Sequence, residues 1–395
     1  MKKTIFFLLC CATCATTIAQ QAEEWVGTWA AAAEYTGQND MPRTTNLQHC
    51  TLRQVVKVSL GGDRLRLQLS NAFSKEPVEI KSVYIADALD SCDINASTAR
   101  YLLFDGKKQV TIAAGQSIMS DAARYALKPL QRLSITIEYG NVPQNATSHR
   151  GSRTTSYITT STVQPKQRFQ ATEKLAHWYN ITAIDVPAEG RMAIAALGNS
   201  ITDGRGSTTD LQNRWSDMMS AALQGNIGVL NLGIGGNCVV KGGLSEPALK
   251  RFDRDILQQR GVTHLILFEG VNDIGGNKHA EQTASNLISA YKELIGKAHA
   301  KGIKVYGGTI LPFGRSGYWS YFNEAVRQTV NEWIRTSGAY DGVIDFDQLM
   351  RDPEEPTRLR AEWQDDWLHP NAKGYKAMGE FAASFIQQQL GTVQQ

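Results

Sequence analysis

A serine follows an apolar run at the point where the chain turns polar. The stretch "AIAALGNSITDGRGS", residues 193 to 207, passes through Asn199 to Ser200 and continues to Asp203. If the run is a buried strand that leads into a helix, unpaired backbone N–H groups at the helix start lie beside Ser200. A helix N-cap or turn serine is the commoner explanation of such a motif alone. A nucleophilic serine also requires a base and an orienting acid.

The segment "DDWLHPNAKGY" near the C-terminus can supply both groups. Asp366 and His369 lie three residues apart, and Pro370 precedes the expected last helix. In a tight turn the aspartate can accept a hydrogen bond from one imidazole nitrogen while the other nitrogen faces a serine. Asp365 is the rival acid, although its longer spacing suits a compact turn less well. A surface Asp-His pair that caps a helix is the alternative explanation.

Two further segments offer donors for a developing oxyanion. "NLGIGGN" contains glycines whose N–H groups no side chain obstructs, and "FEGVNDIG" contains Asn272. Backbone N–H groups and asparagine amides both stabilise tetrahedral intermediates of acyl transfer. Taken singly, a Gly-rich turn and an asparagine that bonds its own loop are equally plausible.

These four motifs follow strands of one predicted sheet or precede its last helix. The expected strands are apolar throughout and cover residues 192–197, 227–234, 263–270, 303–311 and 340–346. Helical stretches are expected near residues 210–223, 245–259, 280–301, 319–336 and 372–390. Apolar strands that alternate with helices predict a parallel sheet covered on both faces. Ligands of such sheets bind at the carboxyl ends of the strands.

The first half of the chain has a different periodicity. From about Trp25 to Pro187 the runs "RQVVKVSL", "DRLRLQLS", "VEIKSVYIAD", "RLSITIEYG" and "WYNITAIDV" read as short strands. Gly61 and Gly62 between the first two runs indicate a two-residue hairpin. Long helical periodicity is absent, so we expect a β-sandwich or jelly-roll-like domain, with the boundary near residue 188.

The ordered set of motifs resembles the SGNH hydrolase family, also called GDSL esterases, in "GNSITDG", "NLGIGG", "GVND" and "DWLHP". The resemblance covers roughly residues 190 to 391. It implies a flavodoxin-like three-layer hydrolase domain over residues 188–395. The residue patterns themselves predict a leader over residues 1–19 and a β-sandwich-like domain over residues 20–187 before it. The resemblance also implies a catalytic set of Ser200, Gly236, Asn272, Asp366 and His369.

Details of the blocks refine this assignment. Gly236 is preferred to Gly235 because it lies five residues after Asn231, the family's spacing. Asn199 replaces the family's usual aspartate, which is not a member of the triad, so the hydrogen bonds around this loop are open. No cofactor and no metal is required. The N-terminal runs "WVGTWAAA" and "RQVVKVSLGGDRLRLQLSNAF" also resemble the extra β-domain of the acetylxylan-esterase-like branch.

The N-terminal residues and the charge balance indicate where the protein acts and which classes of partner it binds. The start "MKK" and the apolar run that follows are typical of a secretory signal peptide, and lipoprotein processing at Cys10, Cys11 or Cys14 is a minority alternative. Removal of Lys2 and Lys3 from the 41 basic residues leaves 39 against 38 acidic residues, a formal charge of +1. This balance favours neither nucleic acid nor an anionic membrane. Beyond the leader, no run is long enough to span a membrane.

Three cysteines remain after the leader, so at least one thiol stays free. Export permits a disulfide between Cys50 and Cys92, while burial of all three, including Cys238, is equally compatible with the sequence. No cysteine-histidine spacing predicts a metal site.

These observations predict a secreted or periplasmic esterase that removes acetyl groups from acetylated xylan or a related plant polysaccharide. Trp367, between Asp366 and His369, is expected near the substrate, although most tryptophans belong to cores. A lipase or arylesterase on the same scaffold is the runner-up, and a non-catalytic carbohydrate-binding protein is the alternative of another class.

Overall fold

The computed structural model describes residues 23–276 and 280–391. The predicted leader, residues 1–19, lies outside the described residues. Within the described part of the chain, no helix is long and apolar enough to cross a membrane. The name "β-rich region" is used below for residues 23–187 and "α/β region" for residues 188–391.

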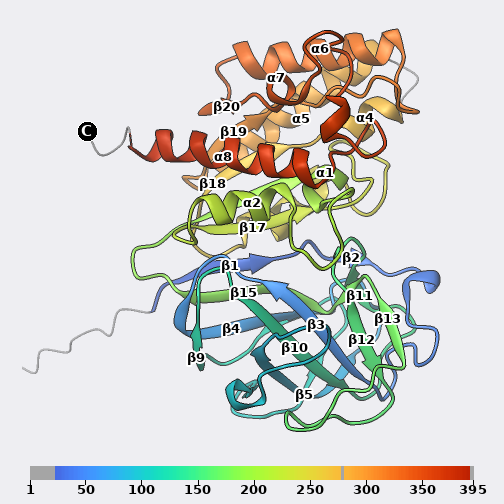
Figure 1. The fold of residues 1–395 in the computed structure, drawn as a ribbon, viewed down its shortest axis with the longest axis vertical. Coiled ribbons are helices and arrows are strands. Elements are labelled where there is room, and N and C mark those ends of the chain that lie inside the picture. Colours follow the sequence, from blue (N-terminus) through green and yellow to red (C-terminus); the bar gives the residue numbers. More distant parts are fainter. Residues whose placement is uncertain (1–22, 277–279, 392–395) are drawn as a thin grey trace, which may run out of the picture.

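A five-stranded sheet forms the centre of the α/β region (Figure 1). Its strands are β16 (Ala193–Gly198), β17 (Gly228–Gly233), β18 (Val262–Phe268), β19 (Lys304–Gly308) and β20 (Gly342–Ile344). All pairings are parallel, and the order is β17-β16-β18-β19-β20. This is the flavodoxin-like order, in which the second strand lies on one side of the first strand, β16, and the later strands lie on its other side. The connections diverge at this point and leave a crevice at the carboxyl ends of the strands.

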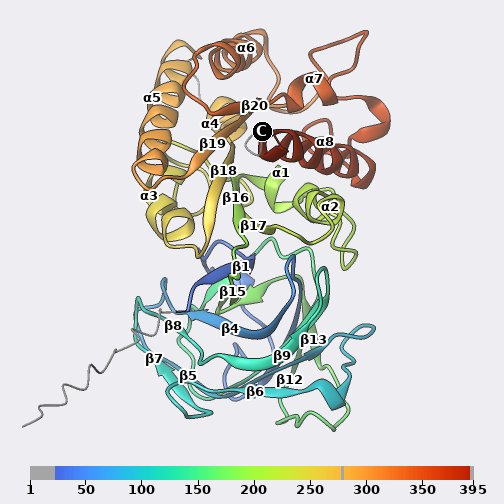
Figure 2. The same ribbon diagram turned by 90° about the vertical axis from the view of Figure 1, so that its left-hand side faces the viewer.

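Helices cover both faces of this sheet, as the alternating pattern predicts. Figure 2 shows α3 and α5 on one side and α2 and α8 on the other. The bounds are α1 (Ser200–Asp203), α2 (Trp215–Ala222), α3 (Ala248–Phe252), α4 (Val271–Gly275), α5 (Ala280–His299), α6 (Tyr321–Thr336), α7 (Phe346–Met350) and α8 (Ala372–Gly391). A π-helical turn, Asp253–Leu257, continues α3. Helix α2 begins later than predicted because the polar residues 204–213 form a loop instead.

Antiparallel sheets make up the β-rich region. One sheet has the order β13-β12-β3-β10-β5-β6, with β7 beside β5; a second has β1-β15-β4-β8, with β9 beside β4; a short third has β14-β11-β2. The bounds are β1 (Trp25–Ala30), β2 (Glu34–Tyr35), β3 (Thr51–Lys57), β4 (Gly62–Ser70), β5 (Val78–Asp87), β6 (Arg100–Leu102), β7 (Val110–Ile112), β8 (Ser117–Met119), β9 (Ala123–Leu127), β10 (Arg132–Tyr139), β11 (Thr147–His149), β12 (Ser156–Thr159), β13 (Glu173–Leu175), β14 (Trp178–Tyr179) and β15 (Ile181–Pro187).

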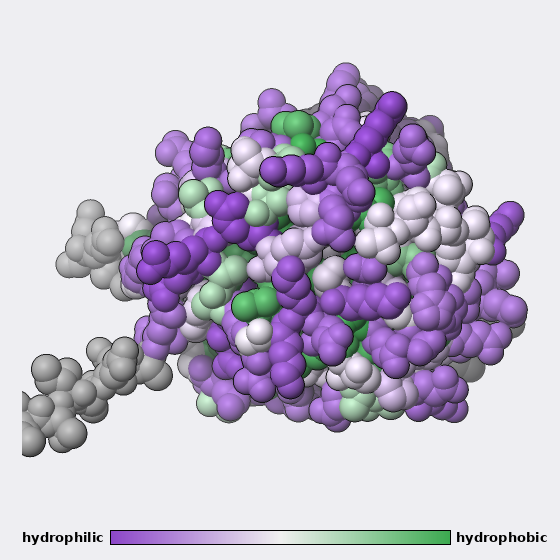
Figure 3. Space-filling model, turned by 90° about the horizontal axis from the view of Figure 1, so that it is seen from below, coloured by the Kyte–Doolittle hydropathy of each residue, from purple (hydrophilic) through white to green (hydrophobic). Residues whose placement is uncertain are grey.

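Alternation of apolar and polar residues along the strands explains how these sheets bury one face. In β4 the side chains of Leu65, Leu67 and Leu69 are buried, whereas Arg66 and Gln68 between them are partly exposed. Period-two patterns of this kind place apolar residues on one side of a strand. The lower face of the β-rich region, seen in Figure 3, is mostly hydrophilic, with hydrophobic side chains only in small separate groups.

The predicted hairpin at Gly61 and Gly62 is wrong. Strand β3 pairs with β10 and β12, and β4 pairs with β15, β8 and β9, so the two strands belong to different sheets. The connecting residues cross to the other sheet, where Ser59 N donates to Thr28 O at 2.8 Å. Gly61 is needed there for close approach, because a Cβ would lie 2.6 Å from Leu127 O.

The two regions share an interface along β1 and β17. A Cβ on Gly228 would lie 2.3 Å from Gly27 O, so the backbones approach more closely than larger residues allow. Across the same interface Val229 N donates to Ser59 Oγ at 3.0 Å. Buried side chains of both regions form one continuous hydrophobic core.

The three described cysteines are free thiols, so Cys50 and Cys92 form no disulfide. Cys50 is buried among apolar side chains of the main core. Burial raises the pKa of its thiol to about 11 and that of Cys238 to about 12. Both groups are therefore protonated and behave as small hydrophobic residues.

Candidate active site

Ser200 begins the one-turn helix α1, directly after strand β16. Asn199 caps this helix, since its side-chain oxygen accepts a hydrogen bond from Ile201 N at 3.0 Å. This contact settles the local role of Asn199, which sequence reasoning left open. As the first helical residue, Ser200 has a backbone N–H with no partner inside the helix.

His369 meets Ser200 across 169 positions of sequence. The Oγ of Ser200 lies 2.8 Å from Nε2 of His369, and Nδ1 of His369 lies 2.9 Å from both carboxylate oxygens of Asp366. The His369 backbone N–H also donates to Asp366 at 2.9 Å, which closes the turn. The rival Asp365 meets His369 through its backbone, since Asp365 N donates to His369 O at 2.8 Å, whereas the ring nitrogen bonds Asp366.

The electrostatics favour a neutral imidazole. Burial lowers the pKa of His369 below its ordinary 6.5, and the positive charges of Arg205 and Arg153 lower it further, while Asp366 only partly offsets these effects. Burial opposes ionisation of Asp366, but its hydrogen bonds from His369 outweigh this and hold the pKa of the carboxyl below its usual value. At neutral pH, His369 can therefore accept the Ser200 proton.

Gly236 and Asn272 lie beside Ser200 at the ends of the neighbouring strands. Gly236 adopts a left-handed conformation, with φ of 68°, in the loop after β17. The amide of Asn272, on α4, is fixed from two sides: its Nδ2 donates to Asn237 O at 2.8 Å, and its Oδ1 accepts from the hydroxyl of Tyr318 at 3.1 Å. These contacts use one of the two amide hydrogens and leave the other for a ligand.

The aspartate that follows Asn272 stabilises the same glycine loop. The carboxylate of Asp273 accepts hydrogen bonds from Val239 N at 2.8 Å and Val240 N at 3.0 Å. Burial raises the pKa of Asp273 to about 6, although these backbone donors oppose the shift. The loop after β17 is therefore tied to α4 at both Asn237 and the residues beyond it.

A cavity of about 380 Å³ opens over Ser200, His369, Gly236 and Asn272. Both regions of the chain line it. The β-rich region contributes Glu34, Asp40, Arg150, Gly151 and Arg153; the α/β region adds Asp203, Arg205, Gly235, Leu244, Tyr318 and Leu368. An adjoining cavity of about 470 Å³ shares Gly236, Asn272 and Tyr318 with it, so these residues lie between the two spaces.

Trp367 is not among the residues that line either cavity. Its backbone is left-handed, with φ of 63°, and its ring packs against the guanidinium groups of Arg315 and Arg358 at 4.9 and 5.8 Å. The predicted substrate role of Trp367 therefore gains no support from the lining of these cavities.

Among the described residues, no group of three or more His, Cys, Asp or Glu side chains is placed to hold a metal ion. The donors at the site are a hydroxyl, an imidazole, amides and guanidinium groups. These groups suit hydrogen bonding to an ester and its oxyanion.

Sequence reasoning missed several residues that shape the site. Tyr318 orients Asn272, Arg205 lies near His369, and Arg153 reaches the cavity from the β-rich region. No periodic pattern or fixed spacing distinguishes these residues. Tyr318 lies in the segment "LPFGRSGYW", between β19 and α6.

Part of the chain is similar to known proteins. The model of the GDSL-like Lipase/Acylhydrolase family matches residues 196–377. The uncharacterized lipoprotein YqeF of Bacillus subtilis is 27% identical over 197 residues, which cover 47% of this chain and 76% of that protein.

Solved structures are similar at lower identity. A GDSL-like lipase from Bacteroides thetaiotaomicron is 20% identical, with a TM-score of 0.39, and the match covers 51% of this chain and 91% of that one. An acetyl xylan esterase is 19% identical, with a TM-score of 0.37, and the match covers 49% of this chain and 100% of that one. Residues 196–377, which contain Ser200, Gly236, Asn272, Asp366 and His369, thus match the GDSL-like lipase and acylhydrolase family.

Proposed function

We propose that the protein is a secreted serine esterase that hydrolyses acetyl or other short acyl esters on carbohydrates, with acetylated xylan or a related plant polysaccharide as substrate. The observation that carries the proposal is the chain of contacts from Ser200 Oγ to His369 Nε2, at 2.8 Å, and from His369 Nδ1 to Asp366, at 2.9 Å. This is the arrangement of a nucleophile, its general base and the acid that orients the base.

In the first step, Ser200 Oγ attacks the acyl carbonyl carbon while its proton passes to His369 Nε2. Asp366 stabilises the imidazolium that forms. The imidazolium then protonates the departing sugar oxygen, which leaves an acyl group on Ser200. Water, deprotonated by His369, attacks this ester, and collapse of the second tetrahedral intermediate releases the acid and restores Ser200.

Three donors serve the oxyanion in both steps: the backbone N–H groups of Ser200 and Gly236 and the side-chain amide of Asn272. Tyr318 supports this role by holding the amide oxygen, which directs the nitrogen toward the other side. Each such donor is typically worth about 3 to 4 kcal/mol of transition-state stabilisation.

The surroundings favour a sugar ester with a short acyl group. Charged and small polar residues dominate the lining of the catalytic cavity, and only Leu244, Leu368 and Tyr318 present large apolar surface. Next to Tyr318, the rings of Trp319, Tyr321 and Phe322 are 37%, 82% and 76% exposed. Exposed aromatic rings of this kind can stack on sugar rings.

Export is supported by the N-terminal residue pattern. The Bacillus subtilis relative is described as a lipoprotein, and this description is consistent with export of the present protein.

The test combines a variant with a substrate series. Ser200→Ala, compared with the wild type at equal folded concentration, is expected to lower ester turnover about 10⁴-fold or more, because the covalent route is lost. The wild type is expected to lose kcat/KM steeply from acetyl to octanoyl nitrophenyl esters and to release acetate from acetylated xylan. Turnover by folded Ser200→Ala near the wild-type level would overturn the mechanism. A preference for octanoyl esters would favour a lipase, and binding of xylan without acetate release would favour a carbohydrate-binding protein.

A further inference from the structure

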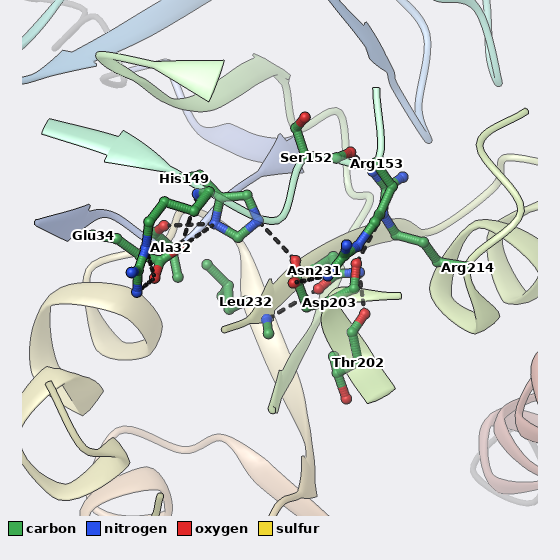
Figure 4. A network of polar contacts seen from close by, with 12 residues as sticks. Ala32, Glu34, His149, Ser152, Arg153, Thr202, Asp203, Arg214, Asn231 and Leu232 are labelled. Carbon is green, nitrogen blue, oxygen red and sulfur yellow. Dashed lines mark hydrogen bonds and ion pairs between the residues drawn. The ribbon is translucent and has the colours of Figure 1, made fainter. Parts of the chain in front are cut away.

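A buried histidine connects the β-rich region to the helix that carries Ser200. His149 ends strand β11 and is 5% exposed. Its Nδ1 lies 2.9 Å from the backbone oxygen of Ala32, and its Nε2 lies 2.9 Å from Oδ1 of Asp203. Figure 4 shows the imidazole directed at the Asp203 carboxylate from the side of the β-rich region. The ring also stacks on Trp178, with centroids 5.6 Å apart.

Both partners of this imidazole can only accept hydrogen bonds. A backbone carbonyl and an ionised carboxylate have no hydrogen to donate, so both ring nitrogens must carry hydrogen. Burial lowers the pKa of His149, but Asp203, Glu34 and the Ala32 carbonyl outweigh burial and raise it. The hydrogen-bond geometry and the neighbouring charges therefore both indicate that His149 is a buried imidazolium.

Charged side chains on the elements packed around His149 contact its imidazole or the acids that pair with it. Asp203 of α1 and Glu34 of β2 are the acids, and Glu34 Oε1 lies 3.7 Å from Nδ1. Arg153 donates to the other oxygen of Asp203 at 3.1 Å, and Arg150 pairs with Glu34 at 2.7 Å. Arg214, before α2, donates to the Asp203 backbone oxygen at 3.2 Å. Each acid thus faces an arginine as well as the histidine.

The Asp203 carboxylate is enclosed by the segment from His149 to Arg153. The side chain is 1% exposed, and a Cβ on Gly151 would lie 1.8 Å from its Oδ2, so Gly151 is required for this close approach. Burial opposes ionisation of Asp203, but His149 and Arg153 outweigh it and lower the pKa of the carboxyl. Asp203 is therefore an anion held by donors of the β-rich region.

Asp203 is the last residue of α1, and Ser200 is the first. A single helical turn is not stable by itself, because nucleation costs more than one turn of hydrogen bonds returns. The position of Ser200 Oγ therefore depends on the contacts at the two ends of the turn: the Asn199 cap at one end and the Asp203 carboxylate at the other.

We propose that His149 is a positioning residue, whose imidazolium holds Asp203 and thereby orients Ser200 toward His369. The inference rests on the proposed esterase function and assigns the β-rich region a part in building the active site, separate from any binding of polymer. Because the pKa of His149 is raised, its contribution is fully present below the ordinary value of 6.5 and is lost as pH rises through the raised value.

The experiment compares three variants of the full chain. His149→Leu removes both donors, His149→Gln restores an uncharged donor that does not titrate, and Ser59→Ala removes a different buried hydrogen bond between the two regions. We expect His149→Leu to lower kcat about 10- to 100-fold with little change in KM, since a displacement near 1 Å can cost 10²-fold. His149→Gln is expected to recover part of kcat and to lack the alkaline decline that the wild type shows. Ser59→Ala is expected to keep the wild-type kcat and pH profile.

Nitrogen NMR of histidine-labelled protein supplies a second readout that needs no activity. The signals absent from His149→Gln identify His149, and we expect both of its nitrogens to remain protonated at pH 7. A neutral His149 at pH 7, or a kcat of folded His149→Leu within twofold of Ser59→Ala, would overturn the proposal. A wild type without esterase activity would instead contradict the proposed function, while the NMR result would still report the charge on His149.

Discussion

Positive charge lies close to the imidazole of His369, the proposed general base. Arg205 follows α1, is exposed, and makes no side-chain hydrogen bond or ion pair with the described part of the chain. Arg153, by contrast, pairs with Asp203. Both charges disfavour the imidazolium of His369, so they favour its neutral form.

This arrangement predicts the acid side of the pH profile. Since the neutral imidazole accepts the serine proton, kcat/KM should rise with pH through the pKa of His369, which lies below 6.5. Arg205→Gln should move this rise to higher pH, because one charge that lowers the pKa is removed. Arg205→Lys keeps the charge and should leave the rise in place.

The comparison is made from kcat/KM for an uncharged acetyl ester between pH 4 and 8, at low and at high salt. Salt screens exposed charges, so it should move the wild-type rise in the same direction as Arg205→Gln and should have less effect on the variant. An identical rise in all three proteins would contradict the role of Arg205.

The strand ends that carry the site are held together by one buried arginine. Arg251 of α3 donates to Gly198 O of β16 at 3.0 Å and to Leu232 O of β17 at 2.7 Å. Its guanidinium also pairs with Asp255 at 3.2 Å and faces Glu269 at 3.7 Å. The same group thus joins the strands before Ser200 and Gly236 to the end of β18.

We predict that Arg251→Met lowers the free energy of unfolding by roughly 3 to 5 kcal/mol, the usual cost of removing one partner from a buried ionic network. Lys250→Met, at the adjacent position of α3, removes an exposed pair with Glu246 and should cost less than about 1 kcal/mol. Urea unfolding of both variants and the wild type provides the measurement. Equal losses would show that Arg251 has no special part in joining the strands.

Much of the parallel sheet could be predicted from the sequence, because each of its strands is an apolar run followed by turn residues. The motif residues could be predicted for the same reason, since Ser200, Gly236 and Asn272 follow strands that are neighbours in the sheet. Their positions at its carboxyl edge follow from the order of strands.

Contacts between distant segments could not be predicted in this way. Tyr318 and His149 act through partners 46 and 54 positions away, and nothing in their local sequence distinguishes them from core or surface residues. The pair Gly61-Gly62 lies where β3 is connected to β4, yet a turn signal does not specify which sheet receives the next strand. Packing between segments far apart in the sequence determines both the partners of Tyr318 and His149 and the sheet that β4 joins.

The two regions of the chain share one hydrophobic core, and their backbones come close together at Gly27 and Gly228. Val26 and Ala30 of β1 belong to the same buried cluster as Val229 and Leu230 of β17. Gly228 permits this packing, because any Cβ there would meet the Gly27 carbonyl oxygen. We therefore expect the described regions to unfold together, in one calorimetric transition.

A larger side chain at this contact should weaken that coupling. Gly228→Val would place its Cβ about 2.3 Å from Gly27 O, so β1 must move away from β17. We expect a loss of about 1 to 3 kcal/mol, the range for overpacked cores, together with a broader or divided calorimetric transition. Gly296→Ala is the control: Gly296 is exposed in the last turn of α5 with no atom within 4 Å of a Cβ there, and the change should raise stability by up to about 1 kcal/mol. Two separate transitions in the wild type would show that the shared core does not couple the unfolding of the two regions. In that case the influence of His149 on Ser200 would have to act through the local contacts at Asp203.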